Sequence, residues 1–266
     1  MLYVTTDASM LPKAAQREGL IVLPRLLKRS QREFDPESNK AYILQPVSVN
    51  DFLVHWRRLE AGDEMIAIHA HRMFEPTIIR AKTAGRLSRP QIETHVYEAL
   101  STHSVRQMID LLLQYRRQLN LNLADLVLEQ IKLETDSWFL QPNGAAQGRW
   151  WRSLWTLFQQ LDWYSFNHLK NKPQKVTWEA LLPDIYHKTR NRRVNVYATG
   201  YPSAAPAAEV IQEMRKWEHV GYLEVTQLQV RYPHINKLVI IECLPSKERI
   251  ETIIHSVFEN TEMTTN

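Results

Sequence analysis

Residues 3–24 read YVTTDASMLPKAAQREGLIVLP and contain the pattern that decides the fold. A short apolar run is followed by a polar turn, a segment with Pro12 near its start and Gly19 at its end, and a second apolar run, LIVLP. Proline in the first turn and glycine just past the last turn are typical of a helix, and short apolar runs are typical of buried strands. This stretch therefore predicts a strand, a helix and a second strand.

The same alternation continues through the first half of the chain. Strands are predicted at DEMIAIHAH (63–71) and ETHVYEA (93–99), and helices at SVNDFLVHWRRLEAG (48–62), EPTIIRAKTAGRL (75–87) and SVRQMIDLLLQYRRQL (104–119). Strands that alternate with helices indicate a parallel sheet with crossover connections. We therefore expect an N-terminal α/β domain over residues 1–121, with any ligand at the carboxyl ends of its strands.

The second half predicts another α/β or α+β domain, over residues 122–266. Strands are expected at RVNVYATG (193–200), GYLEVTQLQV (221–230) and NKLVIIECL (236–244), and helices at 149–163, 177–189, 206–220 and 247–258. Six of the eight tryptophans fall between Trp138 and Trp178. Apolar residues at helical spacing in RWWRSLWTLFQQLDW (149–163) favour core packing between the domains. The alternative is an aromatic surface for a protein partner.

Composition excludes several classes of protein. The chain has 266 residues, is 44% hydrophobic and 23% charged, and carries a formal net charge of +4, so we expect a globular protein. The basic cluster between Lys188 and Arg193 is interpreted as a solvated turn, so no nucleic-acid partner is expected. The sequence shows no secretory signal pattern and no apolar run long enough to span a membrane. The single cysteine, Cys243, lies in an apolar run and is expected to be a buried thiol in a cytoplasmic protein.

The motifs of common enzyme classes are missing from the sequence. There is no GxGxxG, no Walker lysine motif and no GxSxG elbow, so no cofactor and no catalytic residue is expected. The pair His69 and His71 at a strand end has the period-two spacing that some zinc hydrolases use, but further ligands at diagnostic spacing are missing. Asp7 and Glu75 are a conceivable pair of carboxylates, although Glu75 at a helix start also fits the helix dipole.

Hydroxyl groups follow the first strand, and two interpretations of them stay open. Thr5, Thr6 and Asp7 either bind a ligand or cap the helix that begins near Pro12. Ser48 and Ser101 each precede a helix and are explained by capping.

Three segments resemble motifs of the DegV family, the bacterial fatty-acid-binding proteins. They are VTTDASMLP (4–12), LQPVSVNDF (44–52) and IAIHAHRMFEPTIIRA (66–81). Ser48, Phe52 and Ala81 match the family pattern, whereas Leu44 stands at the place of a carboxylate-binding threonine. Glu75 stands at the place of a carboxylate-binding serine, where an ionised side chain would repel a carboxylate.

The resemblance implies a two-domain DegV-like fold and a ligand held between the domains, although the usual carboxylate-binding motifs are not retained. The ligand would be a fatty acid or another apolar small molecule. The head group would meet residues at the matching positions, which are Thr5, Thr6, Ser48, Glu75 and Thr77, with His71 or His234.

Three functions are therefore weighed. The first is a non-enzymatic lipid-binding protein. The second is a diverged DegV-like subunit that has lost the ligand and acts in an assembly, through the tryptophan-rich second half. The third, and the least favoured, is a metal-dependent hydrolase that uses His69 and His71.

Overall fold

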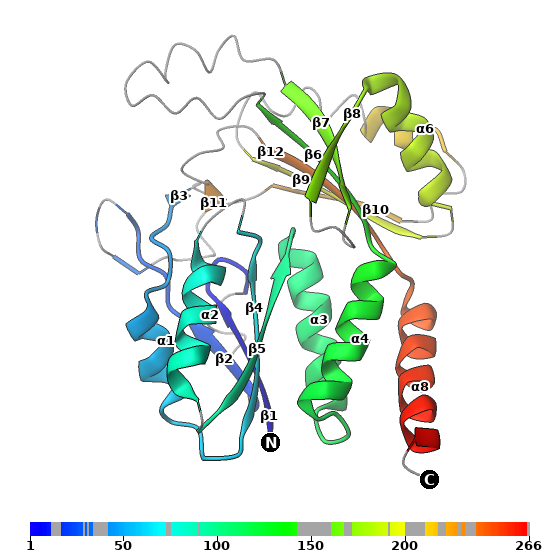
Figure 1. Ribbon diagram of the computed structural model, residues 1–266. Helices are drawn as coiled ribbons and strands as arrows, with labels where there is room; N and C mark the ends of the chain where they lie inside the picture. Colours follow the sequence, from blue (N-terminus) through cyan, green and yellow to red (C-terminus); the bar gives the residue numbers. More distant parts are fainter. Residues whose placement is uncertain are drawn as a thin grey trace. The chain divides into compact units, whose positions relative to one another are not determined.

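The computed structural model describes most of the chain (Figure 1). The described residues are 1–11, 17–28, 30, 32–33, 42–72, 76–89, 91–142, 161–167, 172–190, 192–199, 211–217, 222–227, 230–231 and 238–264. They form two compact units, Met1–Glu129 with Ile253–Asn266, and Gln130–Thr252. The domain boundary predicted between residues 121 and 122 stays a prediction about where independently folding domains meet.

The first unit is built on a four-stranded parallel sheet. Its strands are β1 (Leu2–Asp7), β2 (Leu20–Leu23), β4 (Glu64–Ala70) and β5 (Glu93–Ala99), in the order β2-β1-β4-β5. β1 lies in the middle, so that Asp7 pairs with Leu23 of β2 and Thr5 pairs with Ala67 of β4. A short strand, β3 (Tyr42–Ile43), follows β2 in the chain. The parallel sheet predicted from the alternating pattern is confirmed.

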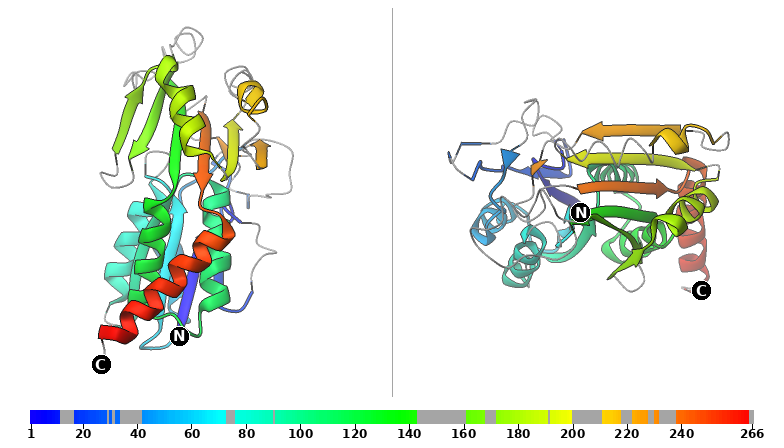
Figure 2. Two further views of the ribbon diagram at one scale, coloured as in Figure 1. Left: turned by 90° about the vertical axis from the view of Figure 1, so that its right-hand side faces the viewer. Right: turned by 90° about the horizontal axis from the view of Figure 1, so that it is seen from above.

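Helices cover both faces of this sheet (Figures 1 and 2). One face carries α1 (Val49–Trp56) and α2 (Thr77–Ser88), and the other carries α3 (Thr102–Tyr115) and α4 (Leu121–Leu133). Successive side chains of a strand point to opposite faces, so the strands read as nearly continuous apolar runs. Beneath α1 and α2, Phe52 and Trp56 pack on Met65 and Ala67 in one buried cluster.

Local signals in the sequence predict the start of α1 correctly, whereas the helix predicted to reach residue 62 ends at Trp56, where the Leu59 N–H donates to the Trp56 carbonyl in a turn. The Ser48 hydroxyl accepts a hydrogen bond from the Asp51 backbone N–H at 3.1 Å, and Asp51 Oδ2 accepts from the Ser48 N–H at 3.0 Å. This reciprocal arrangement is a capping box, which satisfies two backbone donors at the helix start. Phe52 and Trp56 follow one and two turns later, so the capped helix buries both rings completely.

A polar contact ties α4 to the opposite face of the sheet. Asp125 of α4 accepts a hydrogen bond from the Tyr97 hydroxyl, and its Oδ2 lies 2.5 Å from His95 Nδ1. Burial, followed by the hydrogen bond to Asp125, raises the pKa of Tyr97, so its hydroxyl stays protonated and donates.

The second unit contains a mixed six-stranded sheet. Its strands are β6 (Asp136–Pro142), β7 (Leu161–Asn167), β8 (Lys172–Val176), β9 (Arg193–Thr199), β10 (Tyr222–Gln227) and β12 (Leu238–Leu244), in the order β10-β9-β12-β6-β7-β8. Only the β9–β10 pair is parallel among these neighbours. The short strand β11 (Val230–Arg231) precedes β12, and α8 (Lys247–Thr264) ends the described chain.

One helix, α6 (Trp178–Lys188), closes the core of this second unit. Leu181 and Ile185 of α6 pack on Trp138, Val194 and Ile241 of the sheet. Cys243 is buried in the same cluster, and burial raises the pKa of its thiol to about 12, in line with the expected buried thiol.

The helix predicted over residues 149–163 is wrong at its end. Leu161, Asp162 and Trp163 belong to strand β7, which pairs with β6. Strand alternation in LDWYSFN and the pairing partner on β6 outweigh the helical spacing of Trp151, Leu154, Trp155, Phe158 and Leu161. Residues 149–160 lie outside the described part of the chain.

Two further features of the fold bear on the function. The α/β architecture with a second sheet-and-helix unit, predicted from the sequence, is confirmed. No helix in the described ranges is long and apolar enough to cross a lipid bilayer.

Gly19 and Gly62 give a matched test of the backbone of the first unit. Both have positive φ, at 79° and 93°, where a Cβ atom is strained by about 1 kcal/mol. A Cβ at residue 19 would also lie 2.7 Å from Arg116 Nη1, the end of a long side chain that can move, and 3.3 Å from Leu113 Cδ2, whereas a Cβ at residue 62 meets nothing within 4 Å. We expect Gly62→Ala to lower the free energy of unfolding by about 1 kcal/mol and Gly19→Ala by about 2 kcal/mol in urea titrations. Equal losses would contradict this account.

Candidate functional site

A group of buried polar side chains lies at the carboxyl edge of the parallel sheet. We call Thr5, Asp7, Arg25, His69 and Thr77 the carboxyl-edge cluster. Every member has 0% or 1% of its surface exposed. Polar groups buried this completely are costly unless they are paired, so the cluster needs a physical explanation.

Asp7 is the centre of the carboxyl-edge cluster because it ends the central strand. Its Oδ2 lies 2.8 Å from His69 Nδ1, and its Oδ1 accepts from the Ser9 backbone N–H at 3.0 Å and from the Ser9 hydroxyl. Asp7 Oδ1 also lies 3.6 Å from Arg25 Nη1, in an ion pair whose two side chains are completely buried.

Arg25 connects the sheet to helix α2. It follows β2 by two residues, and its Nη1 donates a hydrogen bond of 2.9 Å to Thr77 Oγ1. Thr77 is the first residue of α2, whose start has no side-chain cap. The amino end of a helix carries partial positive charge, and the Arg25 guanidinium is a cation. Together they favour a negatively charged group at this edge.

His69 is held rigidly on two sides. Its Nδ1 faces Asp7, and its ring makes an edge-to-face contact with Phe52 at 5.2 Å between centroids and 86° between planes. Asp7 is ionised, so the proton on Nδ1 is donated to it, which leaves Nε2 at the far side of the ring. This Nε2 is buried and has no hydrogen-bond partner within the described part of the chain.

Thr5 and Thr6 lie on opposite faces of β1. Thr5 shares the face of Asp7 because side chains alternate along a strand, and Thr6 faces α3 and α4. Both hydroxyl oxygens are buried and unpartnered among the described residues. Capping of a helix near Pro12, the second interpretation of these residues, falls on residues 12–16, which lie outside the described ranges.

The charges within the carboxyl-edge cluster compensate each other. Burial alone would raise the pKa of Asp7, but the Arg25 charge, followed by the hydrogen bond from His69, lowers it well below its ordinary value. Asp7 is therefore an anion at neutral pH, and the Arg25 guanidinium is its counterion. With a neutral His69, the cluster has no net charge.

His71 belongs to a neighbouring ion-pair network. Its Nε2 lies 3.0 Å from Glu98 Oε2, and Glu98 also pairs with Lys82 at 3.5 Å and with Arg72 at 3.6 Å. Burial would raise the pKa of Glu98, but the hydrogen bond and charge of His71, together with Arg72, lower it to about 2.

The two histidines of the HAH motif therefore serve different carboxylates. His69 faces Asp7 and His71 faces Glu98. Within the described ranges, no group of three or more histidine, cysteine, aspartate or glutamate side chains is placed to hold a metal ion. The metal hypothesis gains no further ligand from this geometry.

The remaining predicted site residues are not brought into the carboxyl-edge cluster by an observed contact. Ser48 is engaged in the capping box of α1. Glu75 and His234 lie outside the described residues. Trp138 is completely buried and donates to Asp184 at 2.7 Å, and Trp150, Trp151 and Trp155 lie outside the described ranges.

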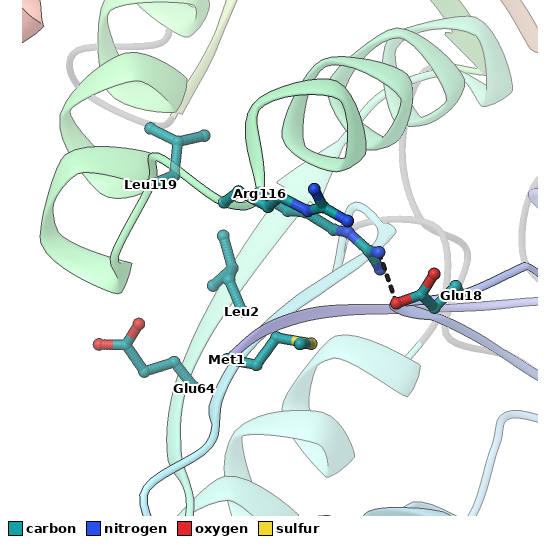
Figure 3. A pocket seen from close by; sticks show the side chains of 7 residues that line it. Met1, Leu2, Glu18, Glu64, Arg116 and Leu119 are labelled. Atoms are coloured by element: carbon teal, nitrogen blue, oxygen red, sulfur yellow. Dashed lines mark ion pairs between the residues drawn. The ribbon is translucent and has the colours of Figure 1, made fainter.

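A separate pocket of about 330 Å³ lies at the opposite, amino end of the sheet (Figure 3). Its wall includes Leu2, Glu18, Glu64 and Arg116. Arg116 pairs with Glu18 at 2.6 Å, and Glu64 accepts from the Leu121 N–H at 3.0 Å. Arg116 Nη1 is buried without a hydrogen-bond partner among the described residues, but the wall of the pocket carries both acidic and basic side chains and so does not favour a ligand of one charge.

Sequence reasoning missed Arg25 and assigned His69 only to a metal site. Arg25 lies in LPRLLKRS, where arginine and lysine normally indicate a solvated loop. The available signal was the run of polar residues that ends strand β1, because a buried anion at Asp7 requires a nearby cation.

Comparison with known proteins supports the architecture. No family model and no curated protein sequence matches this chain. Solved structures do match, among them a fatty-acid-binding DegV family protein from Thermus thermophilus, with 16% identity and a TM-score of 0.61 over 92% of this chain and 99% of that chain.

Two streptococcal structures are similar to the same extent. The fatty-acid-binding DegV family protein of Streptococcus agalactiae has 13% identity and a TM-score of 0.60, covering 93% of this chain and 99% of its own. The fatty acid kinase B3 protein of Streptococcus pneumoniae, loaded with linoleic acid, has 12% identity and a TM-score of 0.59, covering 92% and 100%. The chain therefore has the DegV-like two-domain fold that its sequence predicted.

Removal of the charge of Asp7 tests whether the carboxyl-edge cluster stabilises the fold. Asp7→Asn keeps the shape of the side chain but leaves Arg25 without its buried counterion, which costs about 3 kcal/mol or more. Asp110→Asn is the matched control, because Asp110 forms an exposed pair with Arg17 and such pairs contribute less than about 1 kcal/mol. Urea unfolding of both variants at pH 7 measures the difference, and similar losses would show that the buried pair is dispensable.

The lowered pKa of Glu98 predicts a specific acid sensitivity. The unfolded chain binds a proton near the ordinary value of 4.5, and the folded protein binds it only near 2, so stability falls as pH decreases from about 5 to 2. In the wild type, this effect should lower the free energy of unfolding by about 1 to 2 kcal/mol between pH 5 and pH 2, after allowance for solvent screening. Glu98→Gln should lack that decrease. Glu213→Gln, which alters an exposed pair with Lys216, is the control. Parallel pH–stability curves for wild type and Glu98→Gln would contradict the assignment.

Proposed function

We propose that this protein is a non-enzymatic lipid-binding protein whose ligand, a fatty acid or another apolar molecule with a polar head group, is held by the carboxyl-edge cluster. The single observation that carries the proposal is that two buried polar atoms at this edge, Thr5 Oγ1 and His69 Nε2, have no hydrogen-bond partner among the described residues. An unsatisfied buried polar atom costs about 1 to 3 kcal/mol, and a ligand head group would remove that cost.

The position of the carboxyl-edge cluster supports the proposal. Ligands of open α/β sheets bind outside the carboxyl ends of the strands, and this cluster joins the ends of β1 and β4 to the start of α2. The similar structures from Thermus thermophilus and Streptococcus pneumoniae are described as fatty acid binding and as loaded with linoleic acid, respectively. An acyl tail would supply most of the affinity, at about 0.8 kcal/mol for each buried methylene.

The chemistry of the carboxyl-edge cluster favours binding over catalysis. An Asp–His pair activates a nucleophile only when a hydroxyl or thiol is hydrogen-bonded to the second ring nitrogen. The Ser9 hydroxyl donates to Asp7 instead, and His69 Nε2 is hydrogen-bonded to no hydroxyl of the described residues.

A second candidate function is that of a subunit in an assembly, through the tryptophan-rich half or another apolar surface. Exposed Ile79 and Leu87 on α2, at 55% and 62% of their surface, favour it because they lie on one side of the helix. A protein that is free of lipid and forms a stable complex would favour this alternative over lipid binding.

Lipid binding is tested on protein purified from cells. We expect organic extraction and mass spectrometry to recover about one fatty acid or similar lipid for each chain. Thr77→Val should lower the amount recovered and weaken rebinding of dodecanoate about tenfold, because one charge-assisted hydrogen bond contributes about 1.4 kcal/mol. Thr83→Val, on the exposed side of the same helix, should change neither. Lipid-free wild-type protein that binds no added fatty acid would overturn the proposal.

A further inference from the structure

We propose that His69 Nε2 is the recognition atom for the ligand head group, and that an ionised carboxylate is bound together with one proton. This inference rests on the proposed function and adds to it a named recognition residue and a pH dependence. Thr5 and Thr77 would supply the remaining hydrogen bonds to the same head group.

The imidazole ring of His69 has a fixed orientation. The Asp7 carboxylate holds Nδ1, and the Phe52 ring packs against the imidazole at a right angle. A ring held in this way presents Nε2 in one direction only. Because Nε2 is buried and unpartnered in the described part of the chain, that direction is where a polar atom of a ligand would be stabilised most.

The charged side chains around His69 compensate each other. From β1 it meets Asp7, and from the segment after β2 it meets Arg25, whose charge compensates that of Asp7. Two other charged side chains of the described part of the first unit, Arg80 and Glu98, have their own partners. Arg80 of α2 donates to the carbonyls of Pro46 and Val47, and Glu98 of β5 pairs with His71, Arg72 and Lys82.

A carboxylate ligand can contact His69 Nε2 only if a proton lies between them. With Nδ1–H donated to Asp7, a neutral His69 offers only a lone pair at Nε2, and an ionised carboxylate also offers only lone pairs. Two acceptors repel, so one proton from solvent must enter with the ligand and be shared between Nε2 and a carboxylate oxygen. The proton can reside on His69, which gives an imidazolium and a carboxylate, or on the ligand, which gives an imidazole and a carboxylic acid. The two forms of the complex contain the same number of protons. Either form keeps the buried cluster electrically neutral.

The donors that surround the shared proton fit the same head group. Thr77 Oγ1 already accepts a hydrogen bond from Arg25, so the Thr77 hydroxyl can donate its proton to another group, such as the ligand head group. Thr5 lies on the same face of β1 as Asp7, two residues earlier in the strand, and its hydroxyl has no hydrogen-bond partner in the described ranges. A carboxylate has enough lone pairs to accept from both hydroxyls and from the imidazolium.

Two ligands of equal chain length should therefore differ in the pH dependence of their affinity. Because the complex with a carboxylate contains one proton more than its separate parts, the affinity for dodecanoate should fall as pH rises. The decrease reaches about tenfold per pH unit wherever His69 is neutral in the free protein. Dodecanol donates its own proton to Nε2, so its affinity should not change with pH.

Isothermal titration calorimetry of the lipid-free full chain tests this directly. Dodecanoate and dodecanol are titrated between about pH 6.5 and 8.5, in pairs of buffers that differ in ionisation enthalpy. We expect uptake of about one proton for each dodecanoate and none for dodecanol. His69→Gln keeps an N–H donor but cannot be protonated, so dodecanoate binding should lose both the proton uptake and the pH dependence.

The control variant is His55→Gln. His55 is a partly exposed imidazole on α1 whose Nδ1 lies 2.8 Å from the Asp51 carbonyl oxygen of its own helix, so the variant should keep both effects. Binding of both ligands without proton uptake by the wild type would overturn this inference and leave the proposed function standing. Loss of proton uptake in His55→Gln but not in His69→Gln would overturn the assignment to His69. Binding of neither ligand would overturn the proposed function as well.

Discussion

The buried ion pair between Asp7 and Arg25 is the interaction on which the rest of the first unit depends. A carboxylate and a guanidinium without solvent exposure are tolerated only because each compensates the charge of the other. The pair fixes the end of β1 against the segment after β2. It also positions His69 of β4 through Asp7 and Thr77 of α2 through Arg25, so four separate parts of the chain meet at one edge.

Parallel topology explains why a site can form at this edge. β1 and β4 are neighbours although 62 residues separate Asp7 from His69, and both strands end at the same side of the sheet. β1 ends with Thr5, Thr6 and Asp7, and β4 carries His69 one residue before its end, while apolar residues precede these polar ones in both strands. Burial of the apolar runs therefore fixes the register, and the register brings the polar ends together without any further requirement.

Much of this arrangement could be predicted from the sequence, for identifiable reasons. The capping box at Ser48 and the spacing of Phe52 and Trp56 are local signals that predicted the start of α1, although the predicted helix continued past Trp56 to residue 62. The hydroxyl-bearing residues predicted to follow the first strand belong to β1 itself, because pairing with β2 extends the strand to Asp7. A buried Asp7 indicates that a cation lies nearby, but the sequence does not identify Arg25 as that cation, because the burial of Arg25 depends on a contact with another strand. The aromatic residues of 149–163 misled because residues 161–163 obtain their structure from pairing with β6, which is a non-local contact.

The central claim is that the polar edge of the first sheet binds a ligand head group. A crystal structure of the protein saturated with dodecanoate tests it most directly. The account predicts a carboxylate oxygen within about 3 Å of His69 Nε2, with the Asp7–His69 hydrogen bond retained. A carboxylate bound elsewhere, with Nε2 in contact with protein atoms only, would contradict it.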